Sequence, residues 1–392
     1  MIGYEIRKVP DKGRALFATV NFKKGDTILQ ETPLVSSQFS WNAACKYLAC
    51  EYCMKPLETA EENISRLSGH KGPESTISLP YSECCPVKSF KALQTICPNC
   101  PTRYCSPDCL NTAMERYHRV LCLGSEYNNP GHPLNVLNDA WKKIHYPPET
   151  TTILLCIKLI AMYKQTEQKQ ALFEAIQDFH HEFINENLMI AHKMLGENHQ
   201  NNLNNLFALF SQSFDFTGME MFKNLDTFKR LFALIGENGQ GIGTSSFADW
   251  VQNVSKLNLP TDEKLAADEL IDSCYAQLEE VTGLQFLNNE GSALYSIESK
   301  ANHSCVPNAQ ATFPHSNHNL HLIATRDIQC GEEICISYLD DCLLSRSRHS
   351  RQKELRENYL FNCSCQKCEE QKGEPDVTSD EEYEDGESME ED

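Results

Sequence analysis

Clustered cysteines constrain the fold of this sequence more than any other feature. Of the 19 cysteines, ten lie between residues 45 and 122 and seven between residues 305 and 368. The first group contains two CxxC pairs, followed by a CxxxC and an HxxxC spacing. A CxxC turn holds two thiolates about one tetrahedral edge apart, which suits Zn²⁺. The first group therefore predicts two zinc sites, made by Cys50, Cys53, Cys97, Cys100, Cys105, Cys109, His118 and Cys122.

A smaller ligand set lies near the other end of the sequence. Cys363, Cys365 and Cys368 supply three thiolates, and no cysteine nearby in sequence has the spacing of a fourth zinc ligand. Residues 1–10 lack the long apolar region of a secretory signal. The longest apolar stretch, residues 153–162, is far shorter than the roughly 20 residues that span a membrane. We therefore expect cytoplasm and nucleus as locations, no membrane contact, and cysteines that bind metal rather than form disulfides.

The negative charge is concentrated in one segment. The net charge is −20, and residues 369–392 hold 13 acidic residues and one lysine, a net of −12, which leaves −8 for residues 1–368. Such an acidic segment cannot form a core, so we predict a disordered tail there. The overall charge argues against direct nucleic-acid binding and leaves basic proteins as the expected partners.

Hydrophobic patterning predicts a mixed α+β protein. Short apolar or β-branched runs, separated by Gly and Pro, predict strands at residues 15–19, 27–30, 34–39, 320–325 and 334–338. Apolar residues at helical spacing predict helices within residues 57–67, 150–230 and 262–281. The sequence is thus β-rich near both ends and helical between them.

Three further motifs carry a family resemblance. Residues 302–308 read NHSCVPN, residues 331–338 read GEEICISY, and residues 12–18 read KGRALFA around a glycine-bearing turn. They resemble motifs of SET domains, in that family's order, and Phe361 with the cysteines after it resembles the post-SET zinc segment. The eight-ligand cluster resembles the MYND zinc finger. A MYND finger inserted into a split SET domain resembles the SMYD lysine methyltransferases, and the acidic tail looks most like one particular member.

The resemblance implies a split, β-rich SET domain with a zinc finger and a helical insert. Its parts are expected at 1–49 (N-terminal part of the SET domain), 50–122 (MYND finger with a long internal insertion), 123–230 (helical linker and insert), 231–345 (catalytic core of the SET domain), 346–368 (post-SET zinc segment) and 369–392 (disordered acidic tail).

The resemblance also implies how the metal ligands pair. In the interleaved MYND pattern, one zinc takes Cys50, Cys53, Cys105 and Cys109, and the other takes Cys97, Cys100, His118 and Cys122. The post-SET zinc takes Cys305 beside Cys363, Cys365 and Cys368. This finger departs from the usual pattern in the 43 residues between Cys53 and Cys97, which also contain Cys84 and Cys85. Adjacent cysteines do not form a CxxC turn, so Cys50 and Cys53 are kept as the first pair.

The implied cofactor is S-adenosyl-L-methionine. Its expected contacts are Gly13, Arg14, Ala15, Ser299, Asn302, His303, Tyr338 and Phe361. The expected catalytic residues are Tyr338, beside the methyl group and the amine, and Tyr359, which lines the lysine channel. Ala15 stands where many SET domains have a second glycine. If that position needs a positive φ, alanine there is strained by about 1 kcal/mol.

These features predict a protein-lysine N-methyltransferase that uses S-adenosyl-L-methionine and holds three zinc ions. The expected substrates are histone H3 and H4 tails and other basic proteins, such as ribosomal proteins. A proline-containing peptide is the expected partner of the finger. Two alternatives stay open: a non-catalytic adaptor with a vestigial SET fold, and a chaperone-like arm formed by the acidic tail.

Two weaker patterns admit other functions. His315, His318 and His321 offer a metal site, but they fall in an expected hairpin turn. The glycines of residues 239–243 invite a dinucleotide interpretation, but no clear βαβ unit precedes them. A flexible turn beside the active site is the better prediction for that segment.

Overall fold

The computed structural model describes residues 2–10, 12–69, 77–144, 153–182, 184–185, 188–191, 196–283 and 287–375. The strands are β1 Tyr4–Val9, β2 Gly13–Ala18, β3 Thr27–Glu31, β4 Val35–Gln38, β5 Thr95–Ile96, β6 Arg103–Tyr104, β7 Ile184–Asn185, β8 Ile190–Ala191, β9 Gly239–Thr244, β10 Asn289–Leu294, β11 Asn302–His303, β12 Ala309–Thr312, β13 Leu320–Ala324 and β14 Glu333–Ile336. The α-helices are α1 Ala60–Leu67, α2 Val87–Phe90, α3 Pro107–Ala113, α4 Arg119–Leu121, α5 Pro133–Ile144, α6 Ile153–Gln165, α7 Lys169–Gln177, α8 Glu197–Ser213, α9 Leu225–Asn238, α10 Ser246–Val254, α11 Thr261–Thr282, α12 Asp341–Ser345, α13 Arg348–Tyr359 and α14 Gln366–Glu370. The predicted α+β class is confirmed.

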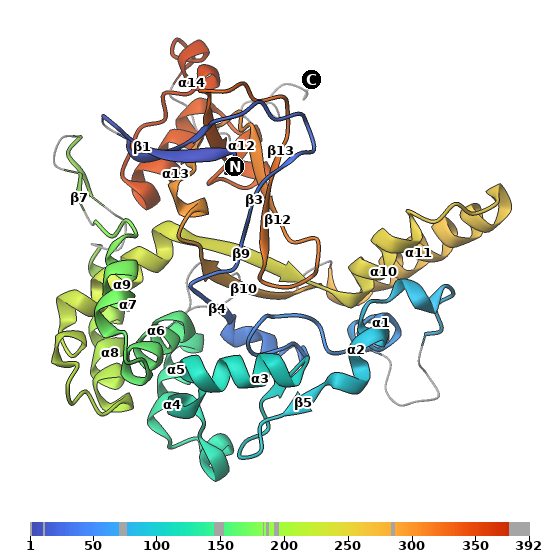
Figure 1. Ribbon diagram of the computed structural model, residues 1–392, viewed down its shortest axis with the longest axis horizontal. Helices are drawn as coiled ribbons and strands as arrows, with labels where there is room; N and C mark the ends of the chain where they lie inside the picture. The colour runs from blue at the N-terminus through green and yellow to red at the C-terminus, as the bar shows by residue number, and fades with distance from the viewer. Residues whose placement is uncertain are drawn as a thin grey trace, which may run out of the picture.

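Three small sheets build the β-rich part of the molecule (Figure 1). Their strand orders are β1-β2-β14-β11, β4-β10-β9 and β12-β13-β3. In each sheet a strand from the first forty residues pairs with a strand that follows residue 288, namely β2 with β14, β4 with β10 and β3 with β13. The two ends of the sequence therefore form one unit, and the finger and the helices are inserted between them.

A very short strand brings two of the sequence motifs together. β11 pairs in parallel with β14, with Asn302 opposite Cys335 and His303 opposite Ile336. Asn308 reinforces this pairing, because its Nδ2 donates to the backbone oxygen of Glu333 at 2.8 Å and its Oδ1 accepts from the backbone nitrogen of Cys335 at 2.7 Å. The NHSCVPN and GEEICISY segments are thus held side by side.

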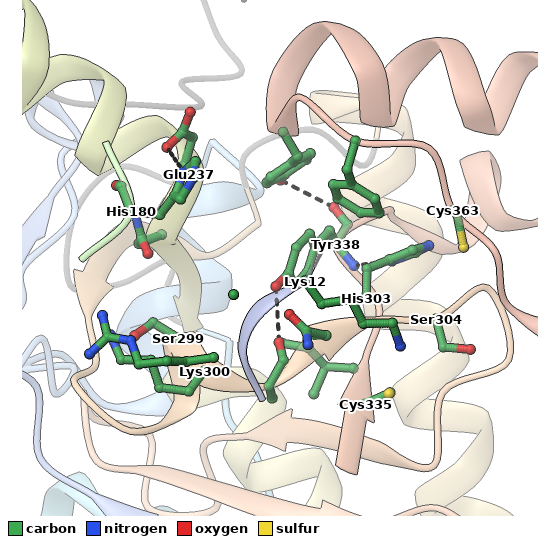
Figure 2. A pocket seen from close by; sticks show the side chains of 18 of the residues that line it. Lys12, His180, Glu237, Ser299, Lys300, His303, Ser304, Cys335, Tyr338 and Cys363 are labelled. Atoms are coloured by element: carbon green, nitrogen blue, oxygen red, sulfur yellow. Dashed lines mark hydrogen bonds and ion pairs between the residues drawn. The ribbon is translucent and has the colours of Figure 1, made fainter. Parts of the chain in front are cut away.

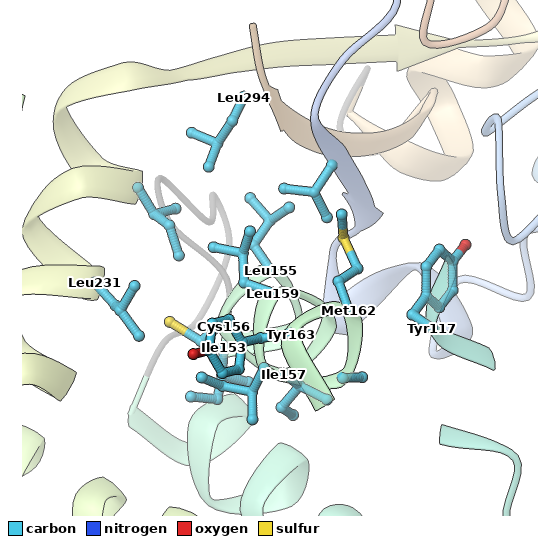
Figure 3. Close-up of a cluster of buried hydrophobic side chains, with 14 of the residues drawn as sticks. Tyr117, Ile153, Leu155, Cys156, Ile157, Leu159, Met162, Tyr163, Leu231 and Leu294 are labelled. Carbon is cyan, nitrogen blue, oxygen red and sulfur yellow. The ribbon is translucent and has the colours of Figure 1, made fainter. Parts of the chain in front are cut away.

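The largest hydrophobic core surrounds α6 (Figure 3). Ten of the 13 residues of α6 are buried, so apolar residues occupy all sides of this helix. Figure 3 shows Tyr117 of the finger, Leu231 of α9 and Leu294 of β10 around it. The finger, the helical insert and the sheets therefore share one core.

The insertion within the finger packs against helices from much later in the sequence. Its helix α1 begins at Ala60 because Thr59 and Glu62 form a capping box. Residues of α1, together with Cys84 and Cys85, share a separate core with α10 and α11. In Figure 1, α11 projects away from the rest of the molecule. The insertion thus packs against α10 and α11, two helices that belong to the region expected to form the catalytic core.

One predicted element is wrong. The glycine-rich residues 239–243 are not a flexible turn but part of β9, which pairs with β10 along its whole length. Glycine is required where α9 ends, because a Cβ on Gly239 would lie 2.5 Å from the carbonyl oxygen of Ile235. The bonds that make this segment a strand come from residues about 50 positions later, which a local pattern does not reveal.

Several expected boundaries differ from the elements. The boundary at residue 230 lies inside α9, the insert 123–230 also contains β7 and β8, and α14 includes the first two residues of the expected tail. Residues 376–392 of that tail lie outside the described residues. No helix in the described part of the chain has the length and apolar character needed to cross a membrane.

Candidate functional site

The predicted metal ligands lie in three groups of four. They are Cys50, Cys53, Cys105 and Cys109; Cys97, Cys100, His118 and Cys122; and Cys305, Cys363, Cys365 and Cys368. Within each group the ligand atoms lie within 4.8 Å of one another, and none of the 19 cysteines is in a disulfide. A tetrahedral site with Zn–S bonds of about 2.3 Å has edges of about 3.8 Å. The Cys53–Cys105 and Cys97–Cys122 sulfur distances are 3.6 and 3.8 Å, so the donors fit zinc.

One helical run positions ligands of both finger sites. α3 begins after Ser106, whose hydroxyl accepts a hydrogen bond from the backbone nitrogen of Cys109. The run continues through a π-helical turn, Met114–His118, into α4. This wider turn carries His118, whose Nε2 lies 3.5 Å from the sulfur of Cys100. Turns of this kind often occur at functional sites, but the sequence spacing gave no sign of it.

The third group joins two distant segments. Cys305 comes from the NHSCVPN motif, and the other three cysteines follow α13. Arg351 of α13 is fully buried, and its Nε donates to the sulfur of Cys305 at 3.3 Å. Its Nη2 lies 3.8 Å from the sulfur of Cys368. Four thiolates around Zn²⁺ carry a net negative charge, which this buried cation offsets.

A large cavity lies beside the third group (Figure 2). Its volume is about 1630 Å³. Small-molecule sites usually occupy about 300–1,000 Å³, so this cavity has room for two reactants. It is lined by eight of the nine predicted catalytic and cofactor-binding residues, namely Gly13, Arg14, Ser299, Asn302, His303, Tyr338, Tyr359 and Phe361.

Tyr338 is held by the NHSCVPN segment. Its hydroxyl donates to the carbonyl oxygen of Ala301 at 3.0 Å, and its backbone nitrogen donates to Nδ1 of His303 at 3.0 Å. Burial raises the pKa of the Tyr338 hydroxyl well above its usual range, so this hydroxyl stays neutral. Since the proton bonds to Ala301, the lone pairs of the hydroxyl oxygen remain available to the cavity.

Two further aromatic rings surround Tyr338. The ring centroid of Tyr359 lies 4.9 Å from that of Tyr338, and that of Phe361 lies 6.2 Å away at an interplanar angle of 89°. Leu360 ends α13 with a φ of +61°, which turns the chain between these two rings. Burial raises the pKa of Tyr359 to about 12. Such apolar surroundings disfavour an ammonium and favour a neutral amine.

The glycine-bearing turn differs in part from its prediction. Gly13 has a φ of +72°, so the need for glycine falls there. Ala15 lies in β2 opposite Arg7, is fully buried, does not line the cavity and has no positive φ. Ala15 therefore does not meet the condition under which strain was expected there. Arg14 lines the cavity, but its guanidinium donates to a side-chain oxygen and the backbone oxygen of Asp178.

Glu333 links the two remaining predicted segments. Its carboxylate accepts from Nδ2 of Asn302 and from Nζ of Lys12, each at 2.8 Å. The glycine-bearing turn and the NHSCVPN segment are thus bridged by the GEEICISY motif. Ser299 lines the cavity nearby, and its hydroxyl makes a long hydrogen bond of 3.5 Å to the carbonyl oxygen of Ser296.

Some residues of the cavity wall were missed by sequence reasoning. Glu298 directly precedes the predicted residue Ser299, but no feature of the sequence marked it as part of the cavity wall. His180 follows α7, and its Nδ1 lies 2.7 Å from Oε2 of Glu237 on α9 (Figure 2). Helical periodicity indicated that this region packs against the core, but nothing in it indicated that the chain reaches the cavity.

The three histidines of the hairpin do not gather as a metal site. His318 is buried, with Nδ1 2.8 Å from the hydroxyl of Ser36. The rings of His315 and His321 meet edge to face, with centroids 5.1 Å apart. No group of metal-ligating side chains in the described part of the chain includes these residues.

Comparison with known proteins agrees with this fold and site. The SET domain family matches residues 13–339, a range that begins with β2 and ends just after Tyr338. The chain is therefore a SET-domain protein, and Cys/His clusters lie within that range and after it.

Similarity to individual proteins is more specific. The "Protein-lysine N-trimethyltransferase SMYD5" of Danio rerio is 49% identical over 371 residues, which cover 95% of this chain and 88% of that protein. The Homo sapiens protein of the same name is 47% identical over 381 residues, covering 97% and 90%. The human "Histone-lysine N-methyltransferase SMYD3" is 39% identical over 111 residues, 28% of this chain and 22% of that protein. The chain belongs to the SMYD5 family, which confirms the predicted resemblance.

Proposed function

We propose that this protein transfers methyl groups from S-adenosyl-L-methionine to lysine side chains of other proteins. The observation that carries the proposal is that Tyr338, the NHSCVPN segment and Phe361 meet at one cavity with room for two reactants. The relatives are named as protein-lysine methyltransferases, and their similarity extends over almost the whole chain. A non-catalytic adaptor that only binds peptides would not need these residues to meet at one cavity.

The residues of the cavity have different roles in the reaction. When bound, the cofactor supplies an electrophilic methyl group on a sulfonium. The protein has to align a neutral lysine amine with that group, so orientation is its main contribution. Tyr338 presents its oxygen lone pairs from a fixed position, because Ala301 holds its proton. Tyr359 and Phe361 place apolar rings beside Tyr338, and such surroundings disfavour the charged ammonium.

Basic proteins are the substrates that we propose, with histone H3 and H4 tails first and ribosomal proteins second. The support is electrostatic: the chain carries a net charge of −20, and residues 376–392 hold ten acids and no base. A negative protein attracts cationic segments and speeds their association at low salt. The relatives' names state trimethylation, and we propose the same product here. Nucleus and cytoplasm are the proposed locations.

Cofactor binding and methyl transfer together test this proposal. Zinc-loaded protein is titrated with S-adenosyl-L-methionine in a calorimeter and then incubated with radiolabelled cofactor and histones or ribosomal proteins. We expect saturable cofactor binding and label on lysine. A folded, zinc-loaded protein that binds no cofactor would contradict the proposal and favour the adaptor alternative. Binding without transfer to these proteins would overturn the proposed substrates.

A further inference from the structure

The helical insert reaches the cavity through a short segment after α7. We call this segment, residues 178–182, the insert strap. Its residues Phe179 to Glu182 line the cavity, and Phe179 is almost fully buried. In Figure 2, His180 of the strap lies on the same side of the cavity as Ser299 and Lys300. The strap therefore forms part of the wall next to predicted cofactor residues.

Lys300 holds the strap from the SET side. Its side chain is 5% exposed, which is rare for a lysine. Its Nζ donates to the backbone oxygen of Asp178 at 2.7 Å and lies 3.1 Å from the carboxylate Oδ2 of Asp178. It also lies 5.1 Å from the ring centroid of Phe179. A buried ammonium is tolerated when it is paired and hydrogen-bonded in this way.

Arg14 bonds to the same residue of the strap. Its guanidinium donates to the carboxylate Oδ1 and the backbone oxygen of Asp178. Partial burial acts to raise the pKa of Asp178, but hydrogen bonds from Arg14 and Lys300 outweigh it and hold that pKa below its usual value. One carboxylate thus joins the glycine-bearing turn, the segment before Asn302 and the strap.

The strap also has attachments that do not involve Lys300. Nδ2 of Asn238 donates to the backbone oxygen of His180 at 2.8 Å, and His180 pairs with Glu237. Both partners belong to the last turn of α9, so these bonds hold the strap to that helix. Loss of Lys300 should therefore release the strap from the cofactor wall without unfolding the insert.

We propose that Lys300 is a positioning residue that, together with Arg14, fixes the insert strap against the wall formed by residues 298–303 and thereby sets the affinity for S-adenosyl-L-methionine. The inference rests on the cofactor use in the proposed function. Lys300 acts through the strap and not on the reacting atoms. Its removal should therefore weaken cofactor binding more than it slows the chemical step.

Cofactor affinity distinguishes this role from a merely structural one. The Kd for S-adenosyl-L-methionine is measured by calorimetry, and KM and kcat by methyl transfer, for wild type, Lys300→Met, Lys300→Arg and Asp178→Asn. Lys300→Met and Asp178→Asn should each raise Kd and KM about tenfold, equivalent to about 1.4 kcal/mol. At saturating cofactor, kcat should stay within about twofold. Lys300→Arg keeps the cation and should recover most of the affinity.

A matched control is available on the surface. Lys23 pairs with Asp327 at 2.7 Å in an exposed position and does not line the cavity, so Lys23→Met should leave Kd unchanged. The Asp178 side chain is 47% exposed, so Asp178→Asn tests the proposal even if Lys300→Met does not fold. A lower melting temperature with unchanged Kd in these variants would overturn the inference alone. A wild-type protein that binds no cofactor would overturn the proposed function and this inference with it.

Discussion

At the scale of single residues, Glu298 is the least expected part of the cavity wall. It is 3% exposed, and its backbone nitrogen donates to a carboxylate oxygen of Glu31 at 2.9 Å. Burial first, and then the negative charge of Glu31, raise the pKa of Glu298 to about 8. At neutral pH the Glu298 carboxyl is therefore mostly protonated, and it adds little negative charge to the wall near Tyr338.

This shift predicts a pH-dependent effect of Glu298→Gln. Between the ordinary pKa near 4.5 and the folded value near 8, the folded chain holds a proton that the unfolded chain has lost. The wild type should therefore lose stability, by up to about 5 kcal/mol, as the pH rises through this range. Glu298→Gln should lack that loss, so its free energy of unfolding relative to wild type should rise between about pH 5 and about pH 9.

Urea denaturation at several pH values measures this difference. Glu269→Gln, an exposed change on α11, is the control and should show a flat difference from wild type. A flat difference for Glu298→Gln would mean that Glu298 is ionised in the folded protein at neutral pH, and would contradict the argument.

Arg351 predicts a selective change at one metal group. Arg351→Met removes the buried cation that lies against the sulfurs of Cys305 and Cys368. The zinc affinity of that group should fall by about 10- to 100-fold, as when a partner of a metal ligand is removed. Zinc transfer to a chromogenic chelator should show one ion leaving early. Arg356→Met, an exposed change on the same helix, should release all three ions as wild type does.

Residues differ in how far the sequence reveals them. The metal ligands were predictable because short spacings, such as CxxC, encode their geometry locally. Glu298, Asp178 and Lys300 were not, because their roles depend on partners more than 100 positions away. The expectation about Ala15 stayed conditional for a related reason, because the sequence did not show which residue of the turn takes the positive φ.

At the scale of elements, α6 connects the finger to the sheets through a buried lysine. Nζ of Lys158 donates to the backbone oxygens of Ser36 and Glu51, each at 3.0 Å, and lies 2.6 Å from a carboxylate oxygen of Glu51. The other carboxylate oxygen of Glu51 accepts from the Tyr117 hydroxyl at 2.8 Å. One ammonium therefore satisfies polar groups from β4 and from the start of the finger.

Lys158→Met should be strongly destabilising. It leaves two backbone oxygens and the partly buried carboxylate of Glu51 without their cation. Loss of one partner of a buried pair lowers the free energy of unfolding by about 3–5 kcal/mol, and we expect the lower end here because Glu51 is partly exposed. Lys164→Met on the same helix is the control, because Lys164 pairs with a mostly exposed Asp215 and should lose less than about 1 kcal/mol. Chemical denaturation of zinc-loaded protein compares the two. Equal losses would contradict the role given to Lys158.

Elements were predictable where their signal is local. The strand run at residues 27–30 and the long helix at 262–281 match β3 and α11 closely, since alternation and helical spacing are properties of neighbouring residues. The glycine-rich β9 and the π-helical turn before α4 were not predicted. The strand β9 depends on its distant partner strand β10, and the π-helical turn depends on the position that His118 takes beside Cys100.

At the scale of the whole molecule, the order of motifs was enough to predict a split domain. Strands near both ends pair with each other, as the resemblance implied. The arrangement of the insertions was not predictable, because α1, α10 and α11, which share a core, all lie outside the recognised motifs. The structure also shows that the expected tail begins with residues attached to the fold, because Gln371 accepts a hydrogen bond from Arg351 at 2.6 Å. A truncation of the tail should therefore follow residue 375.

The central claim is that the protein methylates a substrate lysine in this cavity, and that the hydroxyl of Tyr338 orients the reacting groups. The most direct measurement is mass spectrometry of lysine peptides from a cell extract supplied with deuterium-labelled S-adenosyl-L-methionine and either wild-type protein or Tyr338→Phe. Wild type should place labelled methyl groups on lysines of basic proteins. Tyr338→Phe, which keeps the ring and removes the orienting oxygen, should reduce this labelling about 100-fold or more. Equal labelling by both proteins, or none by a folded, zinc-loaded wild type, would contradict the claim.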